Sequence, residues 1–327
     1  MFYRKFFAPT VFFLSRFSSM NILIRALLPA LALLSPLAAR AFEFKNSDRI
    51  VLLGGTLVER EQQYGWFETS LQLATPGKNL SVRNLGWSGD TVFGHARSYF
   101  GPPAEGLQRL GIHLEQLKPT VLITCYGADM PFEGLIKLPD FISAYRNLLD
   151  LARAKSPNLR VIIVSPPPYE NLGAPLPDLS DANVRLASLR DALKEFAAKQ
   201  NATFLDAFEF MGSGKKPTAK PPLTDNGVHY NEAGYKKFTA GLIGALKVPS
   251  PKLEGEVAEQ LRKTVIRKDF LFFNRWRPAN ETYLHGFRKH EQGQNAREMD
   301  QFDPLVDAQE KKIAELKTKA APPDKLP

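Results

Sequence analysis

The chain has 327 residues, a hydrophobic share of 44% and a formal net charge of +9. This composition excludes a disordered or collagen-like chain and suffices for one sizeable α/β domain with an appendage. Residues 1–41 hold five of the basic residues and no acidic one, so the remainder carries only about +4. So small an excess, without clustered Lys and Arg, argues against a nucleic-acid partner.

The N-terminal segment has the order of regions found in a signal peptide. A basic residue precedes an apolar stretch over 26–34, and the small-x-small triplet Ala39-Arg40-Ala41 follows. We therefore expect residues 1–41 to be a signal peptide, with Met1 or Met20 as the start, and the protein to be exported, either periplasmic or secreted. The alternative is an uncleaved membrane anchor. No later segment has the roughly 18 consecutive apolar residues that a membrane span needs.

After residue 45, short apolar runs rich in Val and Ile alternate with longer amphipathic runs. The short runs predict strands over Arg49–Gly54, Leu80–Leu85, Val121–Tyr126, Leu159–Val164 and Thr203–Leu205. The longer runs predict helices over Trp66–Leu73, Gly106–Leu117, Pro139–Lys155, Asp181–Gln200 and Asn231–Leu246. Short strands that are apolar throughout and alternate with helices are typical of a doubly wound parallel sheet. The sequence therefore predicts an α/β domain with five parallel strands over residues 46–248.

A change of composition marks the end of this domain. Pro249 and Pro251 favour extended chain and end helices. Beyond them, two segments rich in Glu, Lys and Leu predict helices, over 252–269 and 304–319. We expect residues 249–319 to form a helical extension and residues 320–327 a loose tail.

An aromatic and basic stretch, Phe270–Asn295, separates the two predicted helices of the extension. Its rings could present Trp276 and Tyr283 as a platform for a sugar. The favoured alternative is that they dock the extension onto the main domain.

In a doubly wound sheet the active crevice lies beyond the carboxyl ends of the strands. Acyl transfer there requires a hydroxyl nucleophile, a histidine base, a group that orients the histidine, and donors for the oxyanion. Three strand-end loops and one late loop offer such groups: Gly54-Gly55-Thr56, Asn84-Leu85-Gly86-Trp87-Ser88-Gly89-Asp90-Thr91, Tyr126-Gly127-Ala128-Asp129, and Thr224-Asp225-Asn226-Gly227-Val228-His229.

These four blocks, in this order, resemble the SGNH family of GDSL-type hydrolases. The resemblance implies a flavodoxin-like fold and hydrolysis of an ester in a small molecule or a polysaccharide. It also implies roles by position: Thr56 as nucleophile, His229 as base, Asn226 or the neighbouring Asp225 as the group orienting the histidine, and Gly86, Asp129 and Gly55 as oxyanion or substrate contacts. The C-terminal segment resembles an extension on exported relatives of the planctomycete type.

Three of these positions depart from the family pattern. Thr56 replaces serine, and its extra methyl group stiffens χ1 and crowds the path of attack. Asp129 replaces asparagine, and an ionised carboxylate cannot donate a hydrogen bond to an oxyanion. Asn226 replaces aspartate, and an amide stabilises imidazolium poorly. The favoured interpretation is an esterase that acts, for example, on O-acetyl groups of polysaccharide. The alternative is a catalytically impaired binding module for glycan or a partner protein, and a third, weaker possibility is a scaffold of the cell envelope.

Other polar residues receive structural interpretations. Ser88 is expected to brace its loop, Glu170 and Asn171 to lie on the rim, and His95 and His113 to pack or lie on the surface. No cofactor motif is present, and no metal site is predicted. Cys125 is the only cysteine, so the chain cannot form an intrachain disulfide or a cysteine-based zinc site. The sequence leaves the oligomeric state open.

Overall fold

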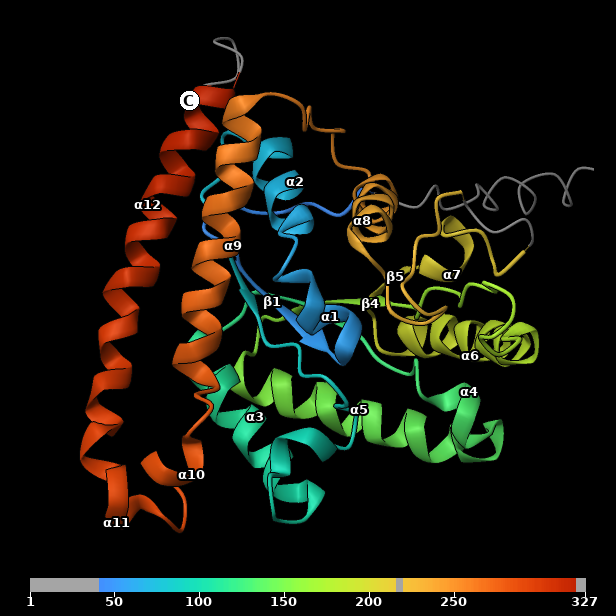
Figure 1. Cartoon of the computed structure of the whole chain (residues 1–327), viewed down its shortest axis with the longest axis horizontal. Helices are drawn as coiled ribbons and strands as arrows, with labels where there is room; N and C mark the ends of the chain where they lie inside the picture. The colour runs from blue at the N-terminus through green and yellow to red at the C-terminus, as the bar shows by residue number, and fades with distance from the viewer. Residues whose placement is uncertain (1–40, 216–219, 322–327) are drawn as a thin grey trace, which may run out of the picture. The chain divides into compact units, whose positions relative to one another are not determined.

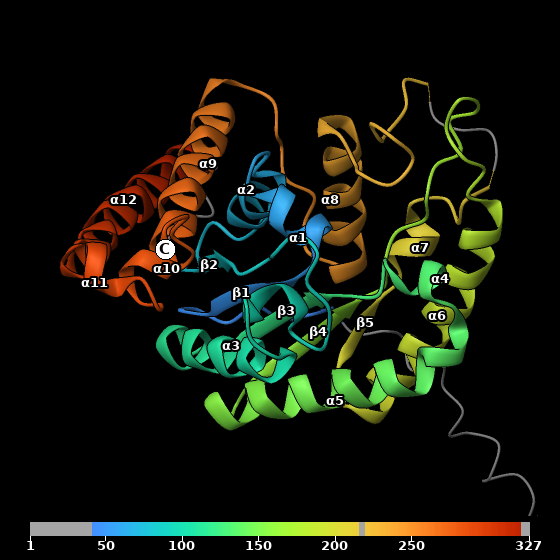
Figure 2. The same cartoon turned by 60° about the horizontal axis from the view of Figure 1, so that its bottom comes forward.

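The computed structural model describes residues 41–215 and 220–321, and its centre is a parallel sheet. The expected signal peptide, apart from Ala41, and the last six residues of the expected tail lie outside the described residues. The strands are β1 (Arg49–Gly54), β2 (Ser81–Asn84), β3 (Val121–Cys125), β4 (Arg160–Val164) and β5 (Thr203–Leu205). They pair in the order β2-β1-β3-β4-β5, all in parallel (Figures 1 and 2). The predicted fold class is confirmed, and each predicted strand begins and ends within one residue of the observed one.

Two helical layers cover the sheet because its strands are apolar on both faces. One face packs against α3 (Pro103–Leu117), α5 (Leu138–Lys155) and α6 (Ser180–Lys199). The other face packs against α2 (Trp66–Ala74) and α8 (Glu232–Leu246). Figure 2 shows α3 and α5 below the sheet and α2 and α8 above it. Alternate residues of one strand serve the two layers: Val51 and Leu53 join the first core, while Ile50 and Leu52 join the second.

Short helices occur where the sequence predicted loops. The most consequential is α1 (Thr56–Glu61), which begins two residues after β1 ends. The others in the domain are η1 (His95–Ser98), α4 (Met130–Glu133), η2 (Leu135–Lys137) and α7 (Ala207–Phe210). A helix of six residues is too short to be stable by itself, so tertiary contacts stabilise α1.

The extension consists of α9 (Glu256–Trp276), α10 (Glu281–Leu284), α11 (Lys289–Gln292), η3 (Gly293–Gln301) and α12 (Phe302–Ala320). The expectation that the first helix ends at residue 269 is wrong. Helix α9 continues through the aromatic residues to Trp276, because Leu271, Phe272 and Trp276 are buried in the main core. Helices α9 and α12 run side by side in opposite directions, and they join through Leu261, Val265, Ile313 and Leu316 (Figure 1). No helix within the described ranges is both long and apolar enough to cross a membrane.

A buried charged group fastens α9 to the domain. The Lys268 ammonium is fully buried, and it pairs with Glu68 of α2 and, at 3.2 Å, with Asp269. It also donates a hydrogen bond of 3.0 Å to the Val82 carbonyl of β2. One cation therefore joins the extension, a helix and the edge strand. Charges removed from water are tolerated only when they are paired and hydrogen-bonded in this way.

Lys268→Met should destabilise the protein by about 3–5 kcal/mol, because it leaves the Glu68 carboxylate buried without its partner. Chemical denaturation followed by circular dichroism measures this loss. The matched control is Lys263→Met on the same helix, whose ammonium is 72% exposed and lies 3.8 Å from Glu259. This control should change stability by no more than about 0.5 kcal/mol. Equal effects of the two substitutions would show that the buried pair does not hold the extension in place.

Candidate active site

The candidate site lies where the strand order of the sheet reverses. Strand β1 pairs with β2 on one side and β3 on the other, so the chain leaves β1 and β3 toward opposite layers. In open α/β sheets, ligands bind outside the carboxyl ends of the strands at such a switch point. A cavity of about 480 Å³ occupies this place. Residues that follow β1, β2, β3 and β4 line it together with residues of the late loop before α8: Gly55, Thr56, Arg60, Gly89, Asp90, Thr91, His95, Asp129, Tyr169, Val228 and His229.

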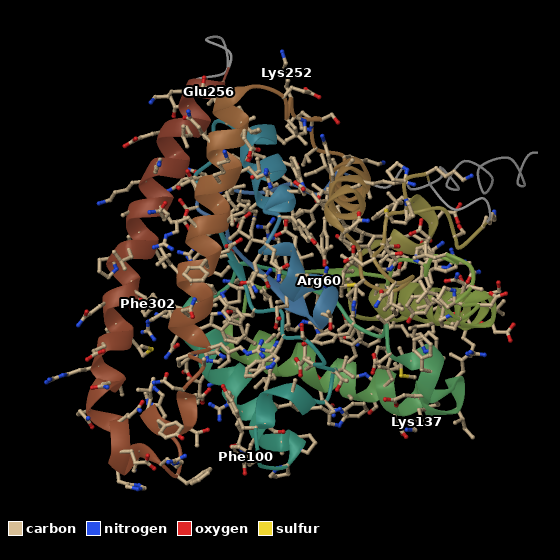
Figure 3. The ribbon with its side chains drawn as sticks, viewed as in Figure 1. Arg60, Phe100, Lys137, Lys252, Glu256 and Phe302 are labelled. Atoms are coloured by element: carbon tan, nitrogen blue, oxygen red, sulfur yellow. The ribbon has the colours of Figure 1, made fainter. Side chains whose placement is uncertain are left out.

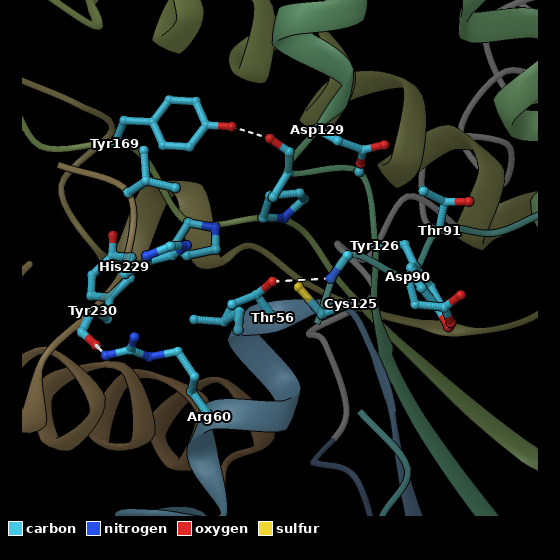
Figure 4. A pocket seen from close by; sticks show the side chains of 18 of the residues that line it. Thr56, Arg60, Asp90, Thr91, Cys125, Tyr126, Asp129, Tyr169, His229 and Tyr230 are labelled. Carbon is cyan, nitrogen blue, oxygen red and sulfur yellow. Dashed lines mark hydrogen bonds between the residues drawn. The ribbon is translucent and has the colours of Figure 1, made fainter. Parts of the chain in front are cut away.

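Thr56 and His229 both point into this cavity (Figure 4). Thr56 is half-buried and opens helix α1, where backbone N–H groups have no partner within the helix. Its Oγ1 accepts a hydrogen bond from the Gly89 N–H at 3.3 Å. Among the described residues, no hydrogen bond joins the Thr56 hydroxyl to the His229 ring. The structure therefore brings the predicted nucleophile and base into one cavity without direct contact.

The structure assigns different tasks to the two glycines of the second block. Gly86 donates its N–H to Asn84 Oδ1 at 2.8 Å and does not line the cavity. A Cβ on Gly86 would lie 2.3 Å from the backbone nitrogen of Glu59, so glycine is needed here to let the loop pack against α1. Gly89, whose φ of +77° suits glycine, presents its N–H to Thr56 instead. Gly89, and not Gly86, therefore presents its N–H at the cavity, so the expectation that Gly86 contacts an oxyanion or substrate does not match its position.

A buried ion pair anchors the loop that carries Gly89. Asp90 and Arg97 are joined at 2.6 Å, and both side chains are fully shielded from solvent. Tyr126, directly after β3, donates its hydroxyl to Asp90 at 2.9 Å. Arg97 also donates to the Leu85 carbonyl at 2.6 Å. Because both ends of the loop are held by these bonds, the Gly89 N–H has a defined direction.

Asn226 sets the tautomer of the His229 ring. Its Oδ1 accepts the backbone N–H groups of Val228 and His229, at 3.1 and 2.8 Å. These two bonds fix the orientation of the amide, so its NH₂ group faces His229 Nδ1 at 3.3 Å. An NH₂ donor makes Nδ1 the acceptor nitrogen and places the ring proton on Nε2. A ring in that tautomer donates from Nε2 and cannot accept a proton there.

Asp225 does not orient His229. Its carboxylate is exposed and pairs with Arg60 at 3.1 Å. Arg60 lies one helical turn after Thr56 and also donates to the Tyr230 carbonyl at 3.4 Å (Figures 3 and 4). The pKa of His229 is lowered by burial and by the positive charge of Arg60, which outweigh the opposite effect of Asp225. His229 is therefore neutral at neutral pH.

Asp129 lines the cavity at the position where the family pattern has asparagine. Burial raises the pKa of Asp129, and the nearby Glu133 carboxylate acts in the same direction. Hydrogen bonds from its own N–H and that of Met130 oppose the increase without cancelling it. The shift favours the protonated carboxyl, which unlike the carboxylate can donate a hydrogen bond.

Sequence reasoning missed several residues of the cavity wall. His95 was expected to pack or lie on the surface, yet it lines the cavity and its Nδ1 lies 2.8 Å from Thr91 Oγ1. Tyr169 and Phe132 form an aromatic wall, with ring centroids 5.4 Å apart. Arg60 could have been found from its spacing, because a residue four positions after Thr56 lies on the same face of a helix. Helix α1, however, was not predicted.

The remaining candidates have structural roles. Ser88 braces its loop by donating its hydroxyl to Glu59 at 2.9 Å. Glu170 accepts the N–H groups of Leu223 and Thr224, both at 2.9 Å, and so holds the late loop. Trp276 is buried edge-on against Trp87, which agrees with a docking role and not with a sugar platform. The parts of the chain that are described contain no cluster of His, Cys, Asp or Glu suited to a metal ion.

The cavity thus combines a hydroxyl at a helix start, a backbone N–H aimed at it, and a neutral histidine. These are the components of acyl transfer, and the GDSL-like Lipase/Acylhydrolase family model matches residues 52–237. The chain belongs to this family. Among curated proteins, no sequence matches it.

Solved structures agree on the fold. A gut microbial diltiazem-metabolizing enzyme is similar with a TM-score of 0.59 and 12% identity, over 84% of this chain and 96% of its own. A candidate GDSL-like lipase from Parabacteroides merdae has a TM-score of 0.51 and 16% identity, over 63% of this chain and 99% of its own. A catalytic mutant of an acetylxylan esterase from Geobacillus stearothermophilus has a TM-score of 0.50 and 15% identity, over 64% of this chain and 98% of its own.

The His229 ring should titrate below pH 6.5, and Arg60→Leu should raise its pKa. The guanidinium opposes protonation of the ring, and its removal also frees Asp225 to favour the imidazolium. An NMR titration of the ring signals measures both values. Arg49→Leu, at the opposite end of β1, serves as the control and should leave the His229 pKa unchanged. A His229 pKa that does not respond to Arg60→Leu would contradict this account of the cavity's electrostatics.

Proposed function

We propose that this protein is an exported esterase that hydrolyses acyl esters with Thr56 as nucleophile and His229 as proton acceptor. The observation that carries the proposal is the convergence of Thr56, the Gly89 N–H and His229 on one cavity at the switch point. Export rests on the order of basic, apolar and small residues before Phe42, which is typical of a signal peptide.

The reaction has two steps. The reacting form of His229 is the tautomer that carries its proton on Nδ1. Thr56 Oγ1 bonds to the ester carbonyl carbon, its proton passes to Nε2 of this tautomer, and the oxyanion accepts the Gly89 N–H. Collapse expels the alcohol, which takes the proton from His229, and leaves an acyl-threonine. Water then attacks the acyl group, with His229 again accepting and returning the proton. A protonated Asp129 would offer a second donor to the oxyanion or to a substrate hydroxyl.

We propose an acylated carbohydrate as the substrate. The Phe132 ring is 60% exposed at the cavity, and with Tyr169 it provides an apolar surface suited to a sugar ring. A second hollow of about 670 Å³ shares His95 and Glu133 with the cavity and contains Lys137, Asp140 and Asn147. The two together offer room for a saccharide longer than the reacting unit. The acetylxylan esterase among the similar structures supports this substrate class.

A second candidate function is ligand binding without turnover. The observation that favours it is the Asn226 amide facing His229 Nδ1, since this tautomer leaves no acceptor at Nε2. In that case the cavity would hold an acylated glycan through hydrogen-bond donors alone. The rate of hydrolysis distinguishes the two functions.

Thr56→Ala and His229→Ala should each abolish hydrolysis of 4-nitrophenyl acetate and of acetylated xylooligosaccharides by the purified protein. Thr56→Ser should raise kcat, because it keeps the hydroxyl and removes the crowding methyl group. Controls are the exposed residues Thr318→Ala and His290→Ala, which should retain wild-type rates. Turnover that persists in His229→Ala would remove His229 from the mechanism and overturn the proposal.

Asn226→Asp should increase kcat/KM by about 10²–10⁴-fold, because a carboxylate accepts a hydrogen bond from Nδ1–H and so leaves Nε2 free to act as the base. Wild-type protein that is inert, with activity appearing in Asn226→Asp or in the combined Thr56→Ser, Asp129→Asn and Asn226→Asp variant, would establish ligand binding as the natural function. An Asn226→Asp variant no faster than an active wild type would show that another group sets the histidine tautomer.

A further inference from the structure

The C-terminal extension contacts the loop that carries the oxyanion donor. Arg277, the residue that follows α9, pairs with the Glu59 carboxylate of α1. Glu59 in turn accepts the Ser88 N–H at 2.7 Å and the Ser88 hydroxyl at 2.9 Å. Ser88 immediately precedes Gly89. Three segments, the nucleophile helix, the Gly89 loop and the extension, therefore meet at one carboxylate.

Stacking fixes the Arg277 guanidinium in this position. Its central carbon lies 3.9 Å from the centre of the Trp87 ring and 5.3 Å from that of Phe273. Trp87 is 5% exposed, and its other neighbours include Trp276 of the extension and the buried Arg97. The planar guanidinium thus covers the Trp87 ring and at the same time pairs with Glu59, the carboxylate that holds Ser88.

The loop is held from two directions. On its inner side Asp90 is bonded to Arg97 and Tyr126, and on its outer side Ser88 is bonded to Glu59 and, through it, to Arg277. Gly89 lies between these two anchors and has a positive φ and no side chain to limit its motion. Without the outer anchor, only Asp90 and the long 3.3 Å bond to Thr56 would set the direction of the Gly89 N–H.

We propose that Arg277 is a positioning residue of the active site, which acts through Glu59 and Ser88 to hold the Gly89 N–H toward Thr56. Arg277 lies outside residues 52–237, the part that the family model matches. The extension accordingly completes the site, although none of its residues lines the cavity. The consequence for catalysis rests on the proposed esterase function, but the consequence for loop order does not.

Hydrogen–deuterium exchange of the full chain tests the loop directly. Arg277→Ala should accelerate amide exchange over residues 86–91 at least about tenfold, because Glu59 without its ion pair no longer holds Ser88 in a fixed position. Arg277→Lys should give an intermediate rate, since a lysine keeps the charge but not the planar stack on Trp87. The matched control is Arg275→Ala, which removes an arginine of α9 that pairs with Asp300 and Asp303 and should leave exchange of the loop unchanged. Wild-type exchange in a folded Arg277→Ala protein would overturn the proposal.

The Glu59→Gln variant provides a second test of the proposal, because it removes the ion pair without changing the extension. It should also accelerate exchange of the loop, and combining it with Arg277→Ala should add little, because both remove the same ion pair. Fully additive effects would mean that Arg277 does not act through Glu59, and would overturn the proposal.

Ester hydrolysis supplies the functional measurement. If the wild type is active, Arg277→Ala should lower kcat about tenfold with KM within about twofold, because an oxyanion contact is made in the transition state. A change confined to KM would overturn the positioning role. If the wild type hydrolyses no ester, the proposed function fails, and the exchange experiment alone decides whether Arg277 orders the loop.

Discussion

The arrangement of the site depends on the ion pair between Asp90 and Arg97, which is shielded from water on every side. Asp90 fixes the loop after β2, and Tyr126 ties this carboxylate to the end of β3. The guanidinium of Arg97 lies against Trp87 of the loop and Trp276 of the extension. Loss of either charge would leave the other buried alone, which is strongly unfavourable in a protein interior. The pair therefore holds the ends of β2 and β3 and the extension in fixed positions relative to one another.

The donors of the cavity share one chemical character. Arg60, the Gly89 N–H and the Nε2–H of His229 all present positive polarity, and burial favours a protonated Asp129. Such a lining suits oxygen acceptors, which both an ester carbonyl and the hydroxyls of a sugar possess. The resting site lacks a strong acceptor for a proton, because the Asn226 NH₂ group donates a hydrogen bond to His229 Nδ1 and leaves the ring proton on Nε2. The departure at position 226 thus changes the site from proton acceptor toward proton donor, whereas Asp129 remains a donor, as asparagine is, only in its protonated form.

The fold was largely predictable because it follows from periodicity along the chain. Short apolar runs specify the strands, and their alternation with amphipathic helices specifies a parallel sheet with its site at the carboxyl edge. The candidate residues Gly55, Thr56, Asp129 and His229 do line that cavity. Their catalytic roles remain predictions.

The details that sequence could not provide depend on contacts between distant segments. Nothing near Gly86 or Gly89 indicates which N–H faces the cavity, since this follows from how the loop packs on α1. The partner of Asp225 is Arg60, 165 residues earlier in the chain, whereas proximity along the sequence suggested His229. Helix α1 was missed for the same reason, because a helix of six residues depends on tertiary packing for its stability.

The separation between Glu59 and Arg277 has a consequence for how the molecule assembles. These residues are 218 positions apart, and Glu68 and Lys268 are 200 apart. Contacts of such range form only after much of the chain has been ordered, because closing the intervening loop costs conformational entropy first. Synthesis from the N-terminus produces Thr56 early and Arg277 near the end. A growing chain therefore contains Thr56 for most of its synthesis before the last brace of the Gly89 loop exists.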